Sequence, residues 1–234
     1  MTPPPAPSKA PPLHWLLLLL SVTTGLVDAI SVLGLGKVFT ANMTGNVVFL
    51  GFAAAGTPGF RAPAYIAALA SFLIGALIAG RIGKHHSGAP LRRWLMTAAM
   101  IEAGLLWIAA VVAIDFDIAT QSPSSSAYAI IGLTGLAMGL RNATIRQLKV
   151  PDLTTTVLTL TLTGLAADSA LAGGANPNWA RRVGAVLAIL IGAAGGAWLV
   201  SHGGLTMPLV IAGALVLAGT LACALHPASA NPHA

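Results

Sequence analysis

The sequence predicts an all-α membrane protein with six spanning helices and two short re-entrant or broken polar helices, arranged as an inverted repeat. Three observations lead to this fold class. Hydrophobic residues make up 56% of the 234 positions and charged residues only 8%, against about 25% charged residues in a soluble domain. Apolar segments recur along the whole chain, and a short motif from the first half returns in the second. A chain with so few charges cannot cover its surface in water.

Eight apolar segments follow one another, separated by short polar loops. They cover residues 14–36, 41–56, 63–83, 93–114, 127–147, 152–170, 179–200 and 204–225. This order predicts one transmembrane domain over 14–225, with halves at 14–114 and 127–225, and disordered tails over 1–13 and 226–234. The first segment has features of a signal peptide, but its apolar run continues to Leu35. It is therefore interpreted as the first transmembrane helix.

The second and sixth segments differ from plain lipid-facing spans. The second contains Asn42, Thr44, Gly45 and Asn46 within a short stretch. The two asparagines are four residues apart and share a helical face, and Gly45 permits close backbone approach. The sixth segment carries a stripe of threonines, Thr155, Thr159 and Thr163. We expect both polar faces to line a solute pathway, with helix–helix packing through small residues and hydroxyls as the alternative.

A weak internal repeat relates the two halves. GLVDA at 25–29 matches GLRNA at 139–143 in the pattern G-L-x-[DN]-A, and each is followed by a short polar segment. The G-x-x-x-G pairs Gly135/Gly139 and Gly192/Gly196 predict close helix crossings.

The basic residues favour a topology in which the second and sixth segments enter and leave on the same side. One side of the membrane then carries Lys9, Arg81, Lys84, Arg92, Arg93, Arg141, Arg146, Lys149, Arg181 and Arg182, and the other only Lys37 and Arg61. If all eight segments crossed, Lys9, Arg61, Arg181 and Arg182 would instead lie opposite the rest. The positive-inside rule selects the first topology, which gives the halves opposite orientations, as in many secondary transporters.

Ionisable side chains at membrane depth are expensive and commonly functional. Asp28 lies midway along the first segment, and Arg141 lies at similar depth in the fifth, next to Asn142, the repeat counterpart of Asp28. A two-fold relation between the halves would bring Asp28 near Arg141 or Asn142, either as a structural salt bridge or as a proton or cation site. Glu102 is the second candidate proton site, with a purely structural hydrogen bond as the alternative. Asp168, near the end of the sixth segment, is interpreted as an interfacial residue or cap.

Several function classes are excluded or disfavoured. The net charge of +6 does not indicate nucleic acid as a partner, because the basic residues lie in loops and form no stripe. A single cysteine, Cys223, gives no intrachain disulfide or Cys-based metal site. The chain contains no P-loop, G-x-S-x-G or H-E-x-x-H motif, so neither ATP-driven work nor a standard hydrolase is expected. We expect no enzymatic activity, no cofactor and no metal.

With these motifs assembled, the chain resembles the YoaK-like family of bacterial inner-membrane proteins, whose domain has unknown function. The similarity is carried by GLVDAISVLGLG leading to VFTANMTGNVVFLG, then GLRNATIR and LTTTVLTLTLTGLA, and it covers about residues 14–225. The family pattern has Thr-Gly where this chain has Thr159-Leu160, so the sixth segment is expected to be straighter here. The resemblance implies a compact inner-membrane protein of the kind presumed to move small molecules.

The function expected from these observations is secondary transport or export of a small solute, with proton coupling as one option. The alternatives are a non-transporting membrane scaffold or sensor subunit, and a channel. The expected partners are the lipid bilayer and a small-molecule solute, and a homo-oligomer is left open. We expect a multi-pass protein of the bacterial inner (cytoplasmic) membrane with both termini in the cytoplasm.

Overall fold

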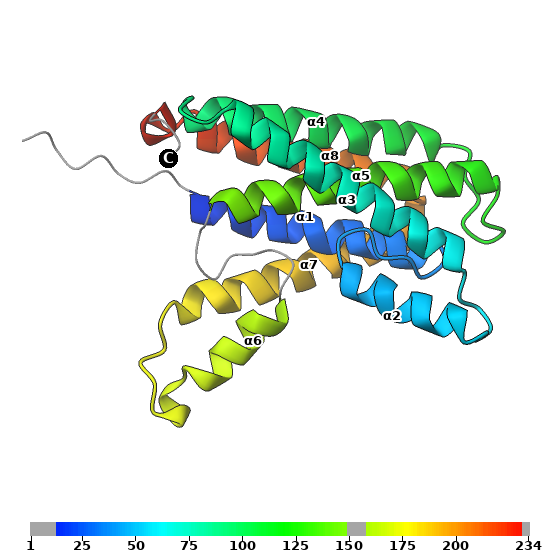
Figure 1. Cartoon of the computed structure of the whole chain (residues 1–234), viewed down its shortest axis with the longest axis horizontal. Helices are drawn as coiled ribbons and strands as arrows, with labels where there is room; N and C mark the ends of the chain where they lie inside the picture. The colour runs from blue at the N-terminus through cyan, green and yellow to red at the C-terminus, as the bar shows by residue number, and fades with distance from the viewer. Residues whose placement is uncertain (1–12, 149–157, 231–234) are drawn as a thin grey trace, which may run out of the picture.

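The computed structural model describes residues 13–148 and 158–230, and these residues form a bundle of helices (Figure 1). The α-helices are α1 Leu13–Gly34, α2 Met43–Ala54, α3 Ala62–His85, α4 Leu91–Val112, α5 Ser124–Leu148, α6 Leu158–Ala167, α7 Trp179–Gly203 and α8 Thr206–Ala224. Two short 3-10 helices, η1 Ala170–Ala172 and η2 Pro227–Ala230, follow α6 and α8. Each apolar segment expected from the sequence overlaps one of the α-helices, which confirms the all-α class for the described residues.

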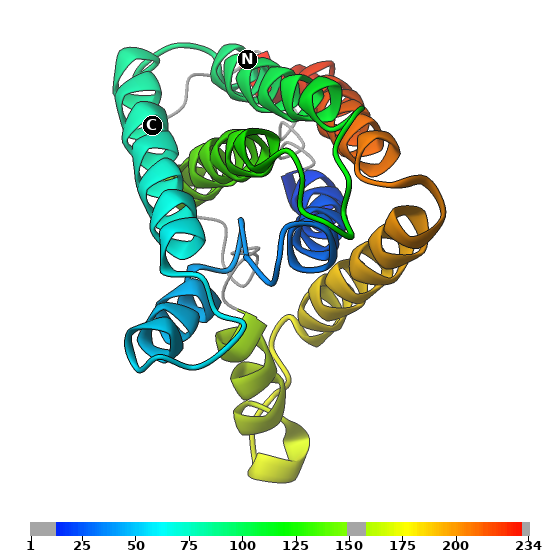
Figure 2. The same ribbon diagram turned by 90° about the vertical axis from the view of Figure 1, so that its right-hand side faces the viewer.

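The two helices that carry the repeated motif, α1 and α5, lie inside the bundle. Figure 2 shows them surrounded on three sides by α3, α4, α8 and α7, with α2 and α6 beyond the fourth side. α1 packs mainly along α7, α5 packs mainly along α3, and α4 packs against α8 and α5. About half of the residues of α1 and α5 are therefore buried by protein.

Length and apolar composition identify five spans where the sequence predicts six. The five helices long and apolar enough to cross a membrane are α1, α3, α4, α7 and α8. α5 has 25 residues, but it carries Arg141, Asn142 and Arg146 and is less apolar. Its place in the interior explains this composition, because side chains that face neighbouring helices need not be soluble in lipid.

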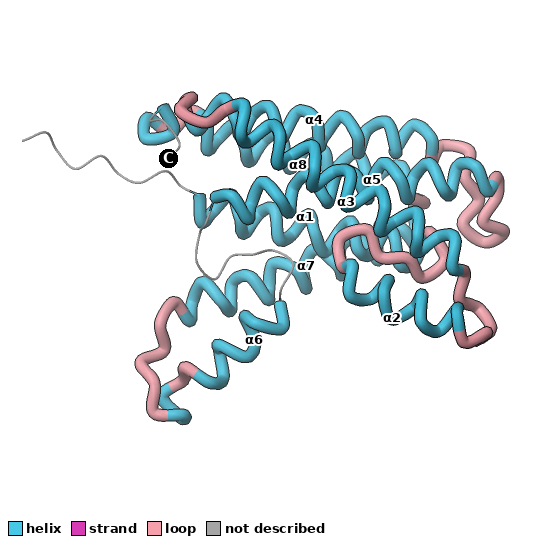
Figure 3. The backbone as a smooth tube through the Cα atoms, viewed as in Figure 1, coloured by secondary structure: helices cyan, strands magenta, loops and turns pink. Residues whose placement is uncertain are grey.

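The two short helices do not have the length of a span. α2 has 12 residues and α6 has 10, which at 1.5 Å per residue gives helices of about 15–18 Å against a hydrocarbon core of about 30 Å. Loops connect α2 to both of its neighbours and α6 to α7 (Figure 3). α2 packs on α3 and α6 packs on α7, and they lie at opposite ends of the bundle (Figure 1).

The outer faces of the long helices are apolar. Exposed side chains on α3, α4 and α7 include Leu73, Leu77, Met100, Val111, Leu190 and Ile191. Soluble proteins rarely expose apolar patches larger than a few hundred Å², and these helices expose large apolar side chains along their length. These faces therefore suit a lipid environment.

Glycines allow α1 to approach α7, and α3 to approach α5, closer than any side chain would permit. A Cβ at Gly25 or Gly192 would overlap the backbone carbonyl of Ile189 or Val22 on the facing helix. A Cβ at Gly139 or Gly75 would likewise overlap the carbonyl of Phe72 or Leu136. The close crossings expected at Gly139 and Gly192 are confirmed, and Gly135 and Gly196 face the same partner helices at slightly longer range.

The basic side chains gather at one end of the bundle, where α1 begins and α8 ends. That end carries Arg81 and Lys84 of α3, Arg92 and Arg93 of α4, Arg146 of α5, and Arg181 and Arg182 of α7. Lys37 and Arg61 lie at the opposite end, after α1 and before α3. Lys9 and Lys149 lie outside the described residues.

One expectation about the chain ends differs from the structure. The sequence predicts a disordered tail over 226–234, but its first part forms η2, which packs on α4 and α8. Ser229 of η2 is buried and donates a hydrogen bond of 2.7 Å from Oγ to the Cys223 carbonyl. This bond holds η2 against the end of α8. The proline-rich tail expected over 1–13 lies almost wholly outside the described residues.

Candidate functional site

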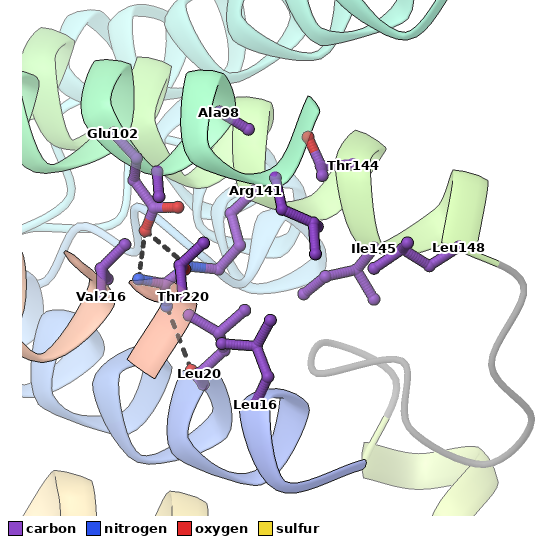
Figure 4. A pocket seen from close by; sticks show the side chains of 12 residues that line it. Leu16, Leu20, Ala98, Glu102, Arg141, Thr144, Ile145, Leu148, Val216 and Thr220 are labelled. Atoms are coloured by element: carbon purple, nitrogen blue, oxygen red, sulfur yellow. Dashed lines mark hydrogen bonds and ion pairs between the residues drawn. The ribbon is translucent and has the colours of Figure 1, made fainter. Parts of the chain in front are cut away.

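A buried ion pair joins α5 to α4 in the middle of the bundle (Figure 4). Arg141 is 1% exposed and Glu102 is 3% exposed. Arg141 donates from Nε to Glu102 Oε1 at 2.6 Å, and its Nη2 makes an ion pair with the same oxygen. In the low-dielectric interior each charge depends on the other, because neither is solvated by bulk water.

The same guanidinium also binds α1. Arg141 Nη1 donates to the Leu20 carbonyl and to Thr24 Oγ1, each at 3.1 Å. The Thr24 hydroxyl in turn donates to the Leu20 carbonyl at 2.8 Å. Arg141 therefore ties three helices, α1, α4 and α5, at one point, and the two interior helices meet there through a charged side chain.

A small cavity adjoins this ion pair. Its lining consists of Leu16, Leu20, Leu95, Ala98, Ala99, Glu102, Arg141, Thr144, Ile145, Leu148, Val216 and Thr220. The volume open to the centre of a water molecule is about 20 Å³. An ordered water needs ~10–15 Å³ by this measure, so the cavity has room for one or two waters.

Asp28 lies elsewhere on α1 and contacts the loop after that helix. Its Oδ1 accepts a hydrogen bond of 3.3 Å from the backbone N–H of Ala41. The described contacts include no hydrogen bond or ion pair between Asp28 and Arg141, whose guanidinium contacts Glu102, Leu20 and Thr24. Asn142, the repeat counterpart of Asp28, donates to the Met138 carbonyl of its own helix at 2.8 Å. The expected meeting of Asp28 with Arg141 or Asn142 thus has no direct bond in this structure.

The polar stretch before and within α2 divides into a structural part and an exposed part. Asn46 is fully buried: its Oδ1 accepts from the Phe39 N–H at 2.9 Å, and its Nδ2 donates to the Phe39 carbonyl at 2.5 Å. Gly45 lies under the Phe39 ring, where a Cβ would approach Cδ2 to 2.6 Å. Asn42 and Thr44 are exposed. Asn46 and Gly45 therefore fix the loop that leads into α2, whereas Asn42 and Thr44 are exposed.

The threonines of α6 divide in a similar way. Thr159 and Thr163 are exposed, whereas Thr161 is buried against the bundle. Thr155 lies outside the described residues. Beyond α6, Asp168 accepts an ion-pair contact of 2.7 Å from Arg182 Nη1 at the start of α7. Asp168 thus has a charged partner as well as its place at the helix end.

Sequence reasoning found both charged residues of the central ion pair but not their pairing. The signal was present, since Glu102 and Arg141 have opposite charge and similar depth in adjacent segments. Thr24 and Thr220 were missed, because a lone hydroxyl in an apolar helix normally bonds to its own backbone. Among the residues that the structure describes, no three His, Cys, Asp or Glu side chains group as metal ligands.

Comparison with known proteins places this architecture in a family. The model of the family described as "Protein of unknown function (DUF1275)" matches residues 16–222. The chain belongs to this family. It is similar to the UPF0700 transmembrane protein YoaK of Bacillus subtilis (strain 168), with 34% identity over 153 residues, which is 65% of each chain. The match thus spans somewhat less than two thirds of that relative. No solved structure matches the chain. The resemblance noted in the sequence is therefore confirmed, and the chain is a multi-pass transmembrane protein.

Proposed function

We propose that this protein is a secondary transporter or exporter of a small solute, built as an inverted repeat of six crossing helices and two short re-entrant helices. The observation that carries the proposal is the matching of two helix crossings. Many secondary transporters consist of inverted repeats, with discontinuous helices near the substrate site. The chain has the parts of that plan.

The close crossings of the two halves correspond residue by residue. Gly25 of α1 meets Ile189 of α7, and Gly139 of α5 meets Phe72 of α3. Gly25 and Gly139 are separated by the same number of residues along the chain as Val22 and Leu136. Phe72 and Ile189 are likewise separated by the same number of residues as Gly75 and Gly192.

A second pair of contacts corresponds between the halves by the same two separations in sequence. Gly192 meets Val22, and Gly75 meets Leu136. Matched partners on matched helices are expected where the two halves are related by a two-fold axis. The correspondence favours a two-fold relation in which the first helix of each half packs against a helix of the other half, α1 on α7 and α5 on α3.

The helix directions agree with an inverted relation. α1 runs away from the basic end, α3 returns and α4 runs away again, whereas α5, α7 and α8 follow the opposite sequence of directions (Figure 1). In this arrangement α5 is the sixth crossing helix. α2 and α6 each enter and leave at one end, which makes them the re-entrant pair.

The basic end is proposed to face the cytoplasm of a bacterial inner membrane. Positive loop residues mark the cytoplasmic side of membrane proteins, and described basic side chains are concentrated where α1 begins and α8 ends. Both termini are then cytoplasmic.

The pathway is proposed to run along the side of α1 and α5 that faces α2 and α6. Exposed polar side chains on re-entrant helices need water or a partner, and Asn42, Thr44, Thr159 and Thr163 are exposed at or on the two short helices. Neutral hydroxyls and amides suit a neutral or amphiphilic solute. Asp28, which is only partly buried, is the candidate for contact with the solute or coupling ion, and no enzymatic step is proposed.

The test is solute flux in proteoliposomes, screened with a mixed library of small metabolites. A transporter gives saturable flux that falls at least tenfold in Asp28→Asn, whereas Asp115→Asn, in an exposed loop, leaves flux unchanged. Flux that rises linearly with solute concentration would indicate a channel. Absence of flux for every solute, with stable protein, would overturn the proposal.

A non-transporting scaffold or sensor subunit is the second candidate. The observation that favours it is the Arg141 network, because Nε and Nη2 contact Glu102 of α4 and Nη1 binds Leu20 and Thr24 of α1. A bundle tied so firmly at its centre suits a rigid platform. A scaffold keeps full stability and partner binding in Asp28→Asn, and it produces no flux.

A further inference from the structure

The two oxygens of the Glu102 carboxylate have different surroundings. Oε1 takes both contacts from Arg141. Oε2 takes no hydrogen bond within the part of the chain that the structure describes, and Figure 4 shows it pointing away from the guanidinium. Glu102 also lines the cavity beside the ion pair. The carboxylate therefore has one oxygen for its counterion and one for the cavity.

The cavity suits water and excludes an organic solute. Its volume of about 20 Å³ admits one or two waters. A second polar group lies at the cavity. Thr220 of α8 lines it, is 4% exposed, and makes no hydrogen bond among the described contacts. Thr144 contributes a third polar group, a hydroxyl that donates to the Leu140 carbonyl and can still accept a hydrogen bond. A water bound here has the two to four polar partners that buried waters need.

The cavity extends from the ion pair toward the basic end of the bundle. Its lining reaches Leu148, the last residue of α5, and Leu16 in the first turn of α1. Figure 4 shows these residues on the side away from Glu102. Water that enters the cavity at that end passes Leu148 and Leu16 and reaches Glu102 farther inside.

The charged surroundings of Glu102 are simple. α5 contributes Arg141, α1 contributes the neutral Leu20 carbonyl and Thr24 hydroxyl near the guanidinium, and α8 contributes Thr220 and Val216. The cavity lining contains no further charged side chain. Beyond the cavity, Asp28 on α1 interacts electrostatically with Arg141 without a direct bond. The charges that act on the pair are therefore those of Glu102, Arg141 and the more distant Asp28.

We propose that Glu102 is a proton-binding site, loaded through a cavity water from the basic end of the bundle, with Arg141 as its internal counterion. Hydronium at the cavity gives its proton to Oε2 and leaves as water. The carboxylate becomes a neutral acid, while Arg141 keeps its proton and its charge. Arg141 keeps its Leu20 and Thr24 contacts on α1 and a hydrogen bond to Oε1, which is now a neutral carbonyl oxygen. Protonation thus removes the charge attraction between α4 and α5 and weakens the joint that Arg141 makes with α4. The proton binding stands by itself, but its use in coupling rests on the proposed transport function.

The test is infrared spectroscopy of the whole protein in lipid vesicles, recorded as the pH is lowered. The chain has six acidic residues, so one carboxylic acid makes a measurable part of the C=O stretching band. Glu102→Gln is expected to remove one carboxylic component, and Asp28→Asn is expected to leave that component in place. Where Glu102→Gln fails to fold, the apolar double substitution Glu102→Leu with Arg141→Met serves as the replacement. A pH-dependent band unchanged in these variants would overturn the proposal.

A matched pair of threonine variants tests the role of the cavity water. Thr220→Val removes a cavity hydroxyl and is expected to shift the frequency and pH midpoint of the Glu102 band. Thr134→Val removes a buried hydroxyl that bonds to the Ile130 carbonyl at 2.6 Å outside the cavity, and it is expected to shift neither. Equal spectra for both variants would contradict loading through this cavity. A band that titrates as predicted while no solute is transported would refute the transporter and leave the proton site standing.

Discussion

Removing one member of the Arg141–Glu102 pair is expected to destabilise the bundle strongly. Both side chains are almost wholly buried, at 1% and 5% exposure of the side-chain atoms. Glu102→Leu leaves a guanidinium without its counter-charge, and Arg141→Met leaves a carboxylate without one. Breaking a buried pair in this way costs about 3–5 kcal/mol. The Leu20 carbonyl is not orphaned by Arg141→Met, because Thr23 and Thr24 still donate to it at 3.0 and 2.8 Å.

The double variant is expected to recover most of the loss. An apolar pair of similar volume in place of a buried ion pair is often neutral or stabilising by ~1–4 kcal/mol. The assay is reversible unfolding in mixed micelles of a mild detergent and dodecyl sulfate, followed by circular dichroism. The four proteins of the double-mutant cycle give the coupling free energy directly.

Two results would refute this reasoning. Single variants that each lose less than about 1 kcal/mol would mean that water or lipid headgroups solvate the remaining charge. A double variant whose loss equals the sum of the two single losses would mean that the side chains act independently. In either case the pair would not be the joint that holds α1, α4 and α5 together.

Three further outcomes follow from other contacts. Gly139→Ala is expected to lose about 1–3 kcal/mol of stability by overpacking against α3, whereas Gly104→Ala, which faces open space, gains up to ~1 kcal/mol from helix propensity; detergent unfolding midpoints compare them. Asn46→Ala is expected to cost about 1–3 kcal/mol for each Phe39 backbone group it leaves unsatisfied, and limited proteolysis should cut the preceding loop faster. Asp168→Asn is expected to cost less than ~1 kcal/mol by the same unfolding assay, since that carboxylate is 45% exposed.

The sequence alone determined the environment, the class and the approximate helix positions. A chain with 8% charge and recurring apolar segments has no stable soluble form, and in lipid the backbone must satisfy its hydrogen bonds within helices or closed barrels. Repeated glycines indicated close crossings, because the absence of a Cβ is a property of the residue itself. The GLVDA and GLRNA motifs predicted that α1 and α5 correspond, but not that both lie inside the bundle.

Only the tertiary structure decided which polar groups meet. Asn42 and Asn46 belong to the same short stretch, yet one is exposed and the other encloses the Phe39 backbone, because a hydrogen-bond partner seven residues away depends on how the loop bends. Arg141 pairs with Glu102 and not with Asp28 for a similar reason. Charge and depth limit the candidate partners of a buried ion, but the rotation of each helix about its axis selects among them, and that rotation is fixed by packing along the whole length of the bundle.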